Sequence, residues 1–191
     1  GWLFIIGVNI FVVFCFWVAF GKYGNKRLGG KKALPEFSLF AWFSMLFSAG
    51  MGIGLLYFSV SEPIQHYAQP PIPLDSNSDL AIQALDFTFL HYGLHAWAIY
   101  CVVGLSLAYY AFNRKLPFSL RSIFFPILGR KINSIYGDII DIIAVVATLF
   151  GLATSLGFGS KQIASGLNYL FQIDSGVGTQ IIIIAVITLI A

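Results

Sequence analysis

Charged residues are scarce in this sequence: Asp, Glu, Lys and Arg together make up 10% of the 191 residues. Soluble domains carry about 25% charged residues, so a soluble globular fold is excluded. Cysteine is also rare. Cys15 and Cys101 both lie in apolar runs, so we interpret them as buried thiols and not as a disulfide framework. No segment interleaves clustered basic residues with aromatic ones as nucleic-acid-binding surfaces do, so we expect no nucleic-acid partner.

Apolar residues dominate instead, at 58% of the chain, and they gather in long runs. About 20 apolar residues are enough to cross a bilayer as an α helix. The sequence therefore predicts an all-α integral membrane protein, with residues 1–191 forming one fragment of a transmembrane domain. The chain starts and stops inside apolar runs, so we expect both ends to be cuts through a longer domain. The five predicted transmembrane helices are residues 2–20, 37–60, 80–112, 139–171 and 179–191.

Basic residues gather in two of the loops, 21–34 and 113–137, while the loop 62–79 is acidic and rich in proline. Cytoplasmic loops carry the excess of Lys and Arg in membrane proteins. We therefore place both basic loops in the cytoplasm and residue 1 outside, in a multi-pass protein of the inner (plasma) membrane. Asp138 and Asp141 follow the second basic loop, and we interpret them as partners of a helix dipole.

A glycine-rich stretch interrupts the second predicted span at Ala49–Gly54. Glycine costs a helix about 1 kcal/mol per residue relative to alanine, so this helix is expected to open. Open backbone is tolerated at membrane depth where it is buried in protein or lines a cavity, and transporters place substrate there. The alternative is close helix packing through Gly50 and Gly54, in a GxxxG pattern. The candidate substrate-binding residues in this stretch are Ala49, Gly50, Met51 and Gly52.

Aromatic residues recur in the third predicted span at Tyr92, Trp97 and Tyr100. At 100° per residue these three rings fall within 140° of one another, so in an unbroken helix all of them face one lumen. Aromatic cages bind quaternary ammonium groups through the ring quadrupole. Packing in a core or at the membrane interface is the alternative.

Ionisable and hydroxyl side chains inside the predicted spans are few. His91 and His95 are four residues apart, and a role in handling protons is possible because intramembrane ionisable groups are often functional. A metalloenzyme built on the two histidines is an alternative, although no carboxylate or cysteine stands near them in a zincin-like pattern. Thr148 offers a hydroxyl that can ligate Na⁺ or bond across helices, whereas Leu152, one turn later, offers none. We predict no metal site and no cofactor.

Together these stretches resemble the betaine/carnitine/choline transporter family. The matching stretches occur in the family's order and cover nearly the whole chain. They are Pro35–Ser38, Met45–Leu55, Glu62–Pro63, His91–Tyr100 and Phe150–Gly157.

The resemblance implies a twelve-helix inverted-repeat transporter, similar to the leucine transporter, of which this chain holds the second helix to the start of the sixth. It implies an aromatic box at Tyr92, Trp97 and Tyr100, although many members carry Trp at the position of Tyr92. The remaining wall of that box lies in a helix that this sequence does not include. It also implies a homotrimer.

For the coupling ion, the resemblance implies sodium ligands near Ser48 and Met51 and at Thr148, with a second hydroxyl at the position of Leu152. Because that hydroxyl is missing, the chain looks more like the proton-driven choline carriers, with His91 or His95 as the titrating group. We therefore predict ion-coupled uptake of choline or glycine betaine as an osmolyte or its precursor, driven by H⁺. Sodium-coupled uptake of glycine betaine and a non-transporting packing subunit are the alternatives.

Overall fold

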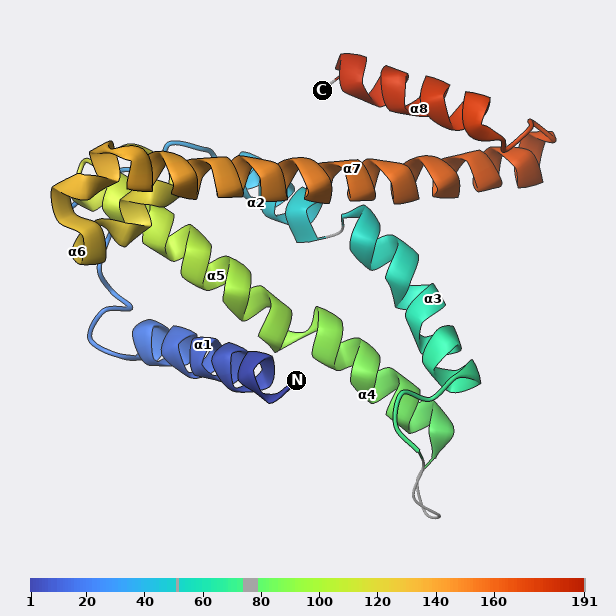
Figure 1. Cartoon of the computed structure of the whole chain (residues 1–191), viewed down its shortest axis with the longest axis horizontal. Coiled ribbons are helices and arrows are strands. Elements are labelled where there is room, and N and C mark those ends of the chain that lie inside the picture. The colour runs from blue at the N-terminus through green and yellow to red at the C-terminus, as the bar shows by residue number, and fades with distance from the viewer. Residues whose placement is uncertain (51, 74–78, 191) are drawn as a thin grey trace.

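A computed structural model describes residues 1–50, 52–73 and 79–190 of the chain (Figure 1). All regular secondary structure in these residues is helical, as expected from the sequence. The elements in chain order are α1 (Trp2–Phe20), α2 (Leu39–Gly50), α3 (Ile53–Ala68), α4 (Leu80–Tyr92), α5 (Leu94–Ala108), the π-helix η1 (Tyr109–Asn113), the 3₁₀ helix η2 (Leu120–Phe124), α6 (Phe125–Leu128), the 3₁₀ helix η3 (Gly129–Asn133), α7 (Ile135–Phe171) and α8 (Val177–Ile190).

The glycine-rich stretch separates two helices. α2 ends at Gly50, and Gly52 adopts extended backbone (φ −61°, ψ 164°) immediately before α3 begins. Met51, between them, lies outside the described residues. The helix interruption predicted for this stretch is therefore present. α3 then continues through Pro63 to Ala68, so the predicted loop 62–79 begins later than expected.

A second interruption, at Gly93, divides the third apolar run into α4 and α5. Gly93 has φ −88° and ψ −150°, and a Cβ atom there would collide with the carbonyl oxygen of Phe89. Only glycine fits this close approach of backbone to backbone. The predicted span at residues 80–112 therefore contains an interruption, so residues on its two sides do not share one helical face.

Three stretches of helix are long and apolar enough to cross a membrane: Trp2–Phe20, Leu80–Asn113 and Ile135–Phe171. The last is one helix of 37 residues, which at 1.5 Å per residue is about 55 Å long. That exceeds the roughly 30 Å of a bilayer's hydrocarbon core. α2 and α8 are apolar but shorter. The all-helical membrane class is thus confirmed.

The helices pack in pairs, and the fold leaves most large apolar side chains exposed. α3 packs against α4, α1 against α5, and α8 folds back along α7 (Figure 1). Among the described residues, the buried apolar ones are three alanines and one isoleucine: Ala84, Ala98, Ala164 and Ile132. Burying apolar surface is the main driving force for folding in water. Much of this chain's apolar surface must instead be covered by lipid or by other protein.

The second basic loop folds into η2, α6 and η3 and is fastened to the start of α7 through Arg121. Its Nε donates to Asp141 Oδ2 at 2.5 Å, and a terminal nitrogen donates to Asp138 Oδ1 at 2.9 Å. The backbone N–H of Arg121 also donates to Asp141. The two carboxylates therefore do more than complement the dipole of α7: they fix the loop to the helix.

Candidate functional site

Trp97 is the predicted site residue that contacts the glycine-rich stretch. A Cβ atom placed on Gly50 would lie 3.6 Å from Cη2 of the Trp97 ring, so the indole covers the backbone at the end of α2. Trp97 belongs to α5, so this contact links α5 to the last residue of α2. Two stretches 47 residues apart in sequence, the open backbone and the aromatic run, therefore meet.

Tyr100 follows Trp97 by one turn of α5, with ring centroids 5.8 Å apart and planes inclined by 46°. Tyr100 is 71% exposed and Trp97 43% exposed, so neither ring is buried within this chain. Two adjacent aromatic rings can attract a cation through their quadrupoles.

Tyr92 lies apart from this pair because of the interruption at Gly93. It is the last residue of α4, and its ring stacks on Phe58 of α3 with centroids 6.3 Å apart. Its hydroxyl interacts with the Glu62 carboxylate. The shared face calculated for all three rings assumed an unbroken helix, so that calculation does not hold. The structure brings Trp97 and Tyr100 together and places Tyr92 with α3.

The residues suggested as sodium ligands lie on α2 and α7. Ser48 is exposed in the last turn of α2, and Met51 is outside the described residues. The Thr148 hydroxyl donates to the carbonyl oxygen of Ala144, at 2.8 Å, within α7. That bond uses the proton and leaves the oxygen lone pairs of Thr148 available. Ala49 lies in α2 between Ser48 and Gly50.

The two histidines suggested for proton handling are not neighbours on one helix. His91 lies on α4 and His95 on α5, on either side of Gly93. His91 Nδ1 instead makes a hydrogen bond with Glu62 Oε1. The same carboxylate oxygen is 3.0 Å from His66 Nε2. Sequence reasoning missed Glu62 and His66 because it assigned both to a loop.

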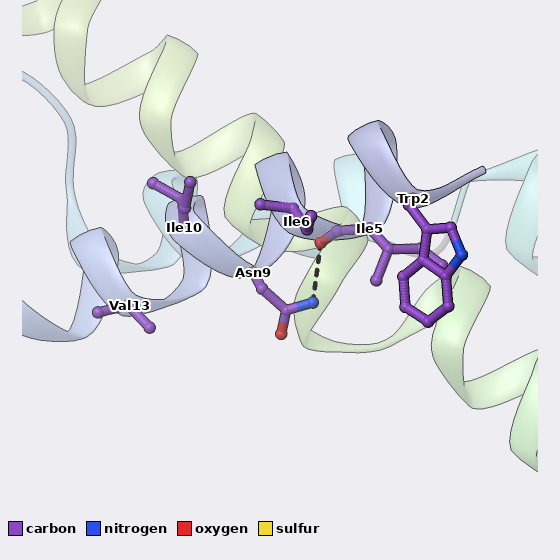
Figure 2. A pocket seen from close by; sticks show the side chains of 6 residues that line it. All are labelled: Trp2, Ile5, Ile6, Asn9, Ile10 and Val13. Atoms are coloured by element: carbon purple, nitrogen blue, oxygen red, sulfur yellow. Dashed lines mark hydrogen bonds between the residues drawn. The ribbon is translucent and has the colours of Figure 1, made fainter.

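Two of the hollows on the surface are mostly apolar. Figure 2 shows one on a single face of α1, lined by Trp2, Ile5, Ile6, Asn9, Ile10 and Val13. Its one polar side chain, Asn9, donates to the carbonyl oxygen of Ile5 at 2.8 Å.

An apolar hollow of about 240 Å³ lies between α1 and α5 beside Trp97. Both cysteines line it as free thiols, but Cys15 is only half-buried and Cys101 is exposed, so the prediction that they are buried was wrong.

Comparison with known proteins decides the family. The sequence profile of the BCCT family, described as betaine/carnitine/choline family transporter, matches residues 1–191. The chain belongs to this family. BCCT proteins are transporters, so membership supports a transporter and not the metalloenzyme considered above.

Several BCCT relatives are similar over the whole chain. Glycine betaine transporter 1 of Vibrio parahaemolyticus is 50% identical over 100% of this chain and 37% of its own length. The probable glycine betaine transporter of Desulfitobacterium hafniense is 46% identical over 100% of this chain and 38% of its own length. A glycine betaine/proline/choline/ectoine transporter of Vibrio parahaemolyticus is 46% identical over 98% of the chain and 34% of its own length. The chain thus spans little more than a third of these relatives.

Proposed function

We propose that this chain contributes to the substrate site of a secondary transporter that carries a quaternary ammonium compound across the inner membrane. The contact of Trp97 with Gly50 carries the proposal. It puts an aromatic ring that can attract a cation beside the end of α2, and the last carbonyl groups of a helix have no intrahelical partner. A quaternary ammonium group has no N–H donors, so aromatic faces are the protein groups that recognise it best.

The start of α3 can bind a carboxylate at the other end of such a substrate. The first intrahelical bond there runs from Leu56 N to Gly52 O, so the amides of the first turn are free of intrahelical partners. Amides at a helix N-terminus favour a carboxylate. Glycine betaine carries one and choline does not, and the relatives named above are called glycine betaine transporters. We therefore propose glycine betaine as a substrate beside the choline expected from the sequence.

The coupling ion and the assembly are further parts of the proposal. The placement of basic residues favours cytoplasmic loops at 21–34 and 113–137, with residue 1 outside. Leu152 next to Thr148 favours H⁺ over Na⁺, and His91 and His95 remain the candidate titrating groups. The twelve-helix inverted-repeat core and the homotrimer rest on the resemblance to the family.

Uptake by the full-length transporter in proteoliposomes tests the proposal. Labelled glycine betaine and labelled choline are offered separately, under an imposed pH gradient or an imposed Na⁺ gradient. Choline is then set against 3,3-dimethylbutanol, which has the same shape without the charge. We expect competition from unlabelled betaine or choline and none from the neutral analogue. Equal competition by the analogue would mean that the site recognises shape and apolar surface, and would contradict the proposal.

A further inference from the structure

Three metal-ligating side chains converge where α3 meets α4. They are Glu62 and His66, one turn apart on α3, and His91 on α4. Glu62 Oε1, His66 Nε2 and His91 Nδ1 all lie within 4.8 Å of one another. Glu62 is 8% exposed, which is low in a chain whose apolar side chains are largely open. The proposed transport function uses His91 only as a candidate titrating group, and it gives Glu62 and His66 no role.

We propose that Glu62, His66 and His91 bind one divalent transition-metal ion of the Zn²⁺ class. Two imidazoles and one carboxylate are a common set of zinc ligands, at about 2.0–2.2 Å from the metal. Around a tetrahedral ion, neighbouring ligand atoms are then about 3.3 Å apart. The 3.0 Å between His66 Nε2 and Glu62 Oε1 is close to that spacing, whereas His91 Nδ1 is hydrogen-bonded to Glu62 Oε1 and must move away from it for both atoms to ligate one ion. Mg²⁺ and Ca²⁺ prefer sites made of oxygen atoms, so they fit this donor set poorly.

The surroundings hold the ligands in place and leave an open position. The ring of His66 lies against Phe87, with centroids 5.5 Å apart, and against His91 at 6.0 Å. The side chain of His91 is 53% exposed, whereas that of His66 is 17% exposed. The ion can therefore enter from the side of His91, and water can complete its coordination. Each neutral imidazole keeps its proton on the ring nitrogen that faces away from the metal.

Such an ion would join α3 to α4. α3 starts at the glycine-rich interruption and α4 ends at Tyr92, so the site lies between the two interruptions of the fold. Without a metal, the hydrogen bond of His91 to Glu62 joins α4 to α3, while that of His66 to the same carboxylate oxygen lies within α3. Only a metal site binds a transition-metal ion, so a direct measurement of metal binding distinguishes it from hydrogen bonding alone.

Co²⁺ titration of the purified full-length transporter is the test, because Co²⁺ in a Zn²⁺ site gives visible d–d absorption. The variants are His66→Gln and His91→Gln, with His95→Gln as the matched control. His95 lies four residues beyond His91 but across Gly93, outside the cluster. Size-exclusion profiles establish that each variant folds, and thermal unfolding with and without Zn²⁺ gives a second readout.

We expect saturable binding of one Co²⁺ with d–d bands, displaced by Zn²⁺, in the wild type and in His95→Gln. In His66→Gln and His91→Gln, we expect the affinity to fall by more than the 10- to 100-fold typical of losing an outer-shell partner. Zn²⁺ should raise the melting temperature of the wild type and of His95→Gln only. No saturable binding in the wild type, or binding that survives in either cluster variant, would overturn the proposal and leave hydrogen bonding as the role of these residues.

Discussion

Trp97 lies directly over Gly50, with ring atom Cη2 3.6 Å from the position of a Cβ on that glycine. That distance is an ordinary van der Waals contact, so the indole leaves room for a Cβ at this position but not for a larger side chain. The relationship connects the two features singled out in the sequence, the glycine-rich stretch and the aromatic run. It also separates the two interpretations of the glycines, because a packing motif requires Gly54 as much as Gly50.

The size of the side chain at position 50 should therefore determine the affinity for substrate. We expect Gly50→Ala to bind substrate nearly as well as the wild type, because its Cβ makes normal contact with Trp97. Gly50→Leu should displace the indole and lose its cation–π contact. The loss is about 2 kcal/mol, or about thirtyfold in substrate affinity. Gly104→Leu on α5 is the control, since a Cβ there meets no described atom within 4 Å. Equal defects at both positions would mean that the loss does not come from the contact with Trp97.

A branched side chain at Gly52 should block transport without unfolding the protein. The backbone of Gly52 is extended (φ −61°, ψ 164°), a conformation that any residue adopts. Gly52→Val therefore adds bulk beside the open backbone without straining it. We expect normal expression and melting temperature but no uptake, measured against Gly104→Val on α5, where a Cβ meets no described atom within 4 Å. Normal uptake by Gly52→Val would show that the open backbone takes no part in transport.

Leu152 should be the residue that weakens sodium coupling. It presents methyl groups one turn after Thr148, whose oxygen lone pairs remain available. Losing one ligand leaves a desolvated ion poorly compensated, at a cost of several kcal/mol. We expect uptake by the wild type to follow the proton gradient, and Leu152→Thr to acquire Na⁺ dependence. Leu149→Thr, on another face of α7, should not. Accumulation by the wild type that follows a Na⁺ gradient alone would contradict this prediction.

Arg121 should set the stability of the second basic loop. Its fork binds Asp141 and Asp138 at once, and lysine cannot reproduce that geometry. We expect Arg121→Lys to lower the melting temperature more than Arg130→Lys, since Arg130 is exposed in the same loop. Equal melting temperatures in the two variants would mean that the pairing of Arg121 with Asp138 and Asp141 does not stabilise the protein.

The direction in which the pKa of Arg121 is shifted determines how the stability of this contact depends on pH. Hydrogen bonding to Asp141, and then to Asp138, raises the pKa of Arg121 above its usual value. A raised pKa contributes stability that is complete below the unfolded-state pKa and lost only as pH rises through the folded-state value. That window is strongly alkaline, so deprotonation of Arg121 should not loosen the loop near neutral pH. Thermal unfolding of wild type and Arg121→Lys between pH 7 and 9 should therefore show a constant difference.

Composition and local propensity were enough to predict the membrane class and the opening of the glycine stretch. Glycine weakens a helix wherever it clusters, and three of them in Gly50–Gly54 make the signal strong. The break at Gly93 gave a weaker signal, since a single glycine is common within membrane helices. The extended backbone of Gly93 comes close to the carbonyl oxygen of Phe89, and no spacing pattern in the sequence marks this contact.

Contacts between distant segments were beyond prediction from the sequence. Glu62 and His91 are 29 residues apart and meet only because α3 packs against α4. The four-residue spacing of Glu62 and His66 was a signal, but Pro63 and the acidic loop after it favoured a loop assignment. α3 continues through that proline, which membrane helices tolerate when neighbouring groups satisfy the freed backbone.

The affinity of the purified full-length transporter for glycine betaine and choline, measured with and without the Trp97 ring, tests the account most directly. The variants are Trp97→Leu and Trp97→Phe, with Trp2→Leu on exposed α1 as the control for the same chemical change. Losing a desolvated cation–π contact costs about 2 kcal/mol, so we expect Trp97→Leu to bind both ligands about thirtyfold more weakly. Trp97→Phe should recover part of the affinity, and Trp2→Leu should match the wild type. Unchanged affinity in Trp97→Leu would contradict the account and remove Trp97 from the substrate site.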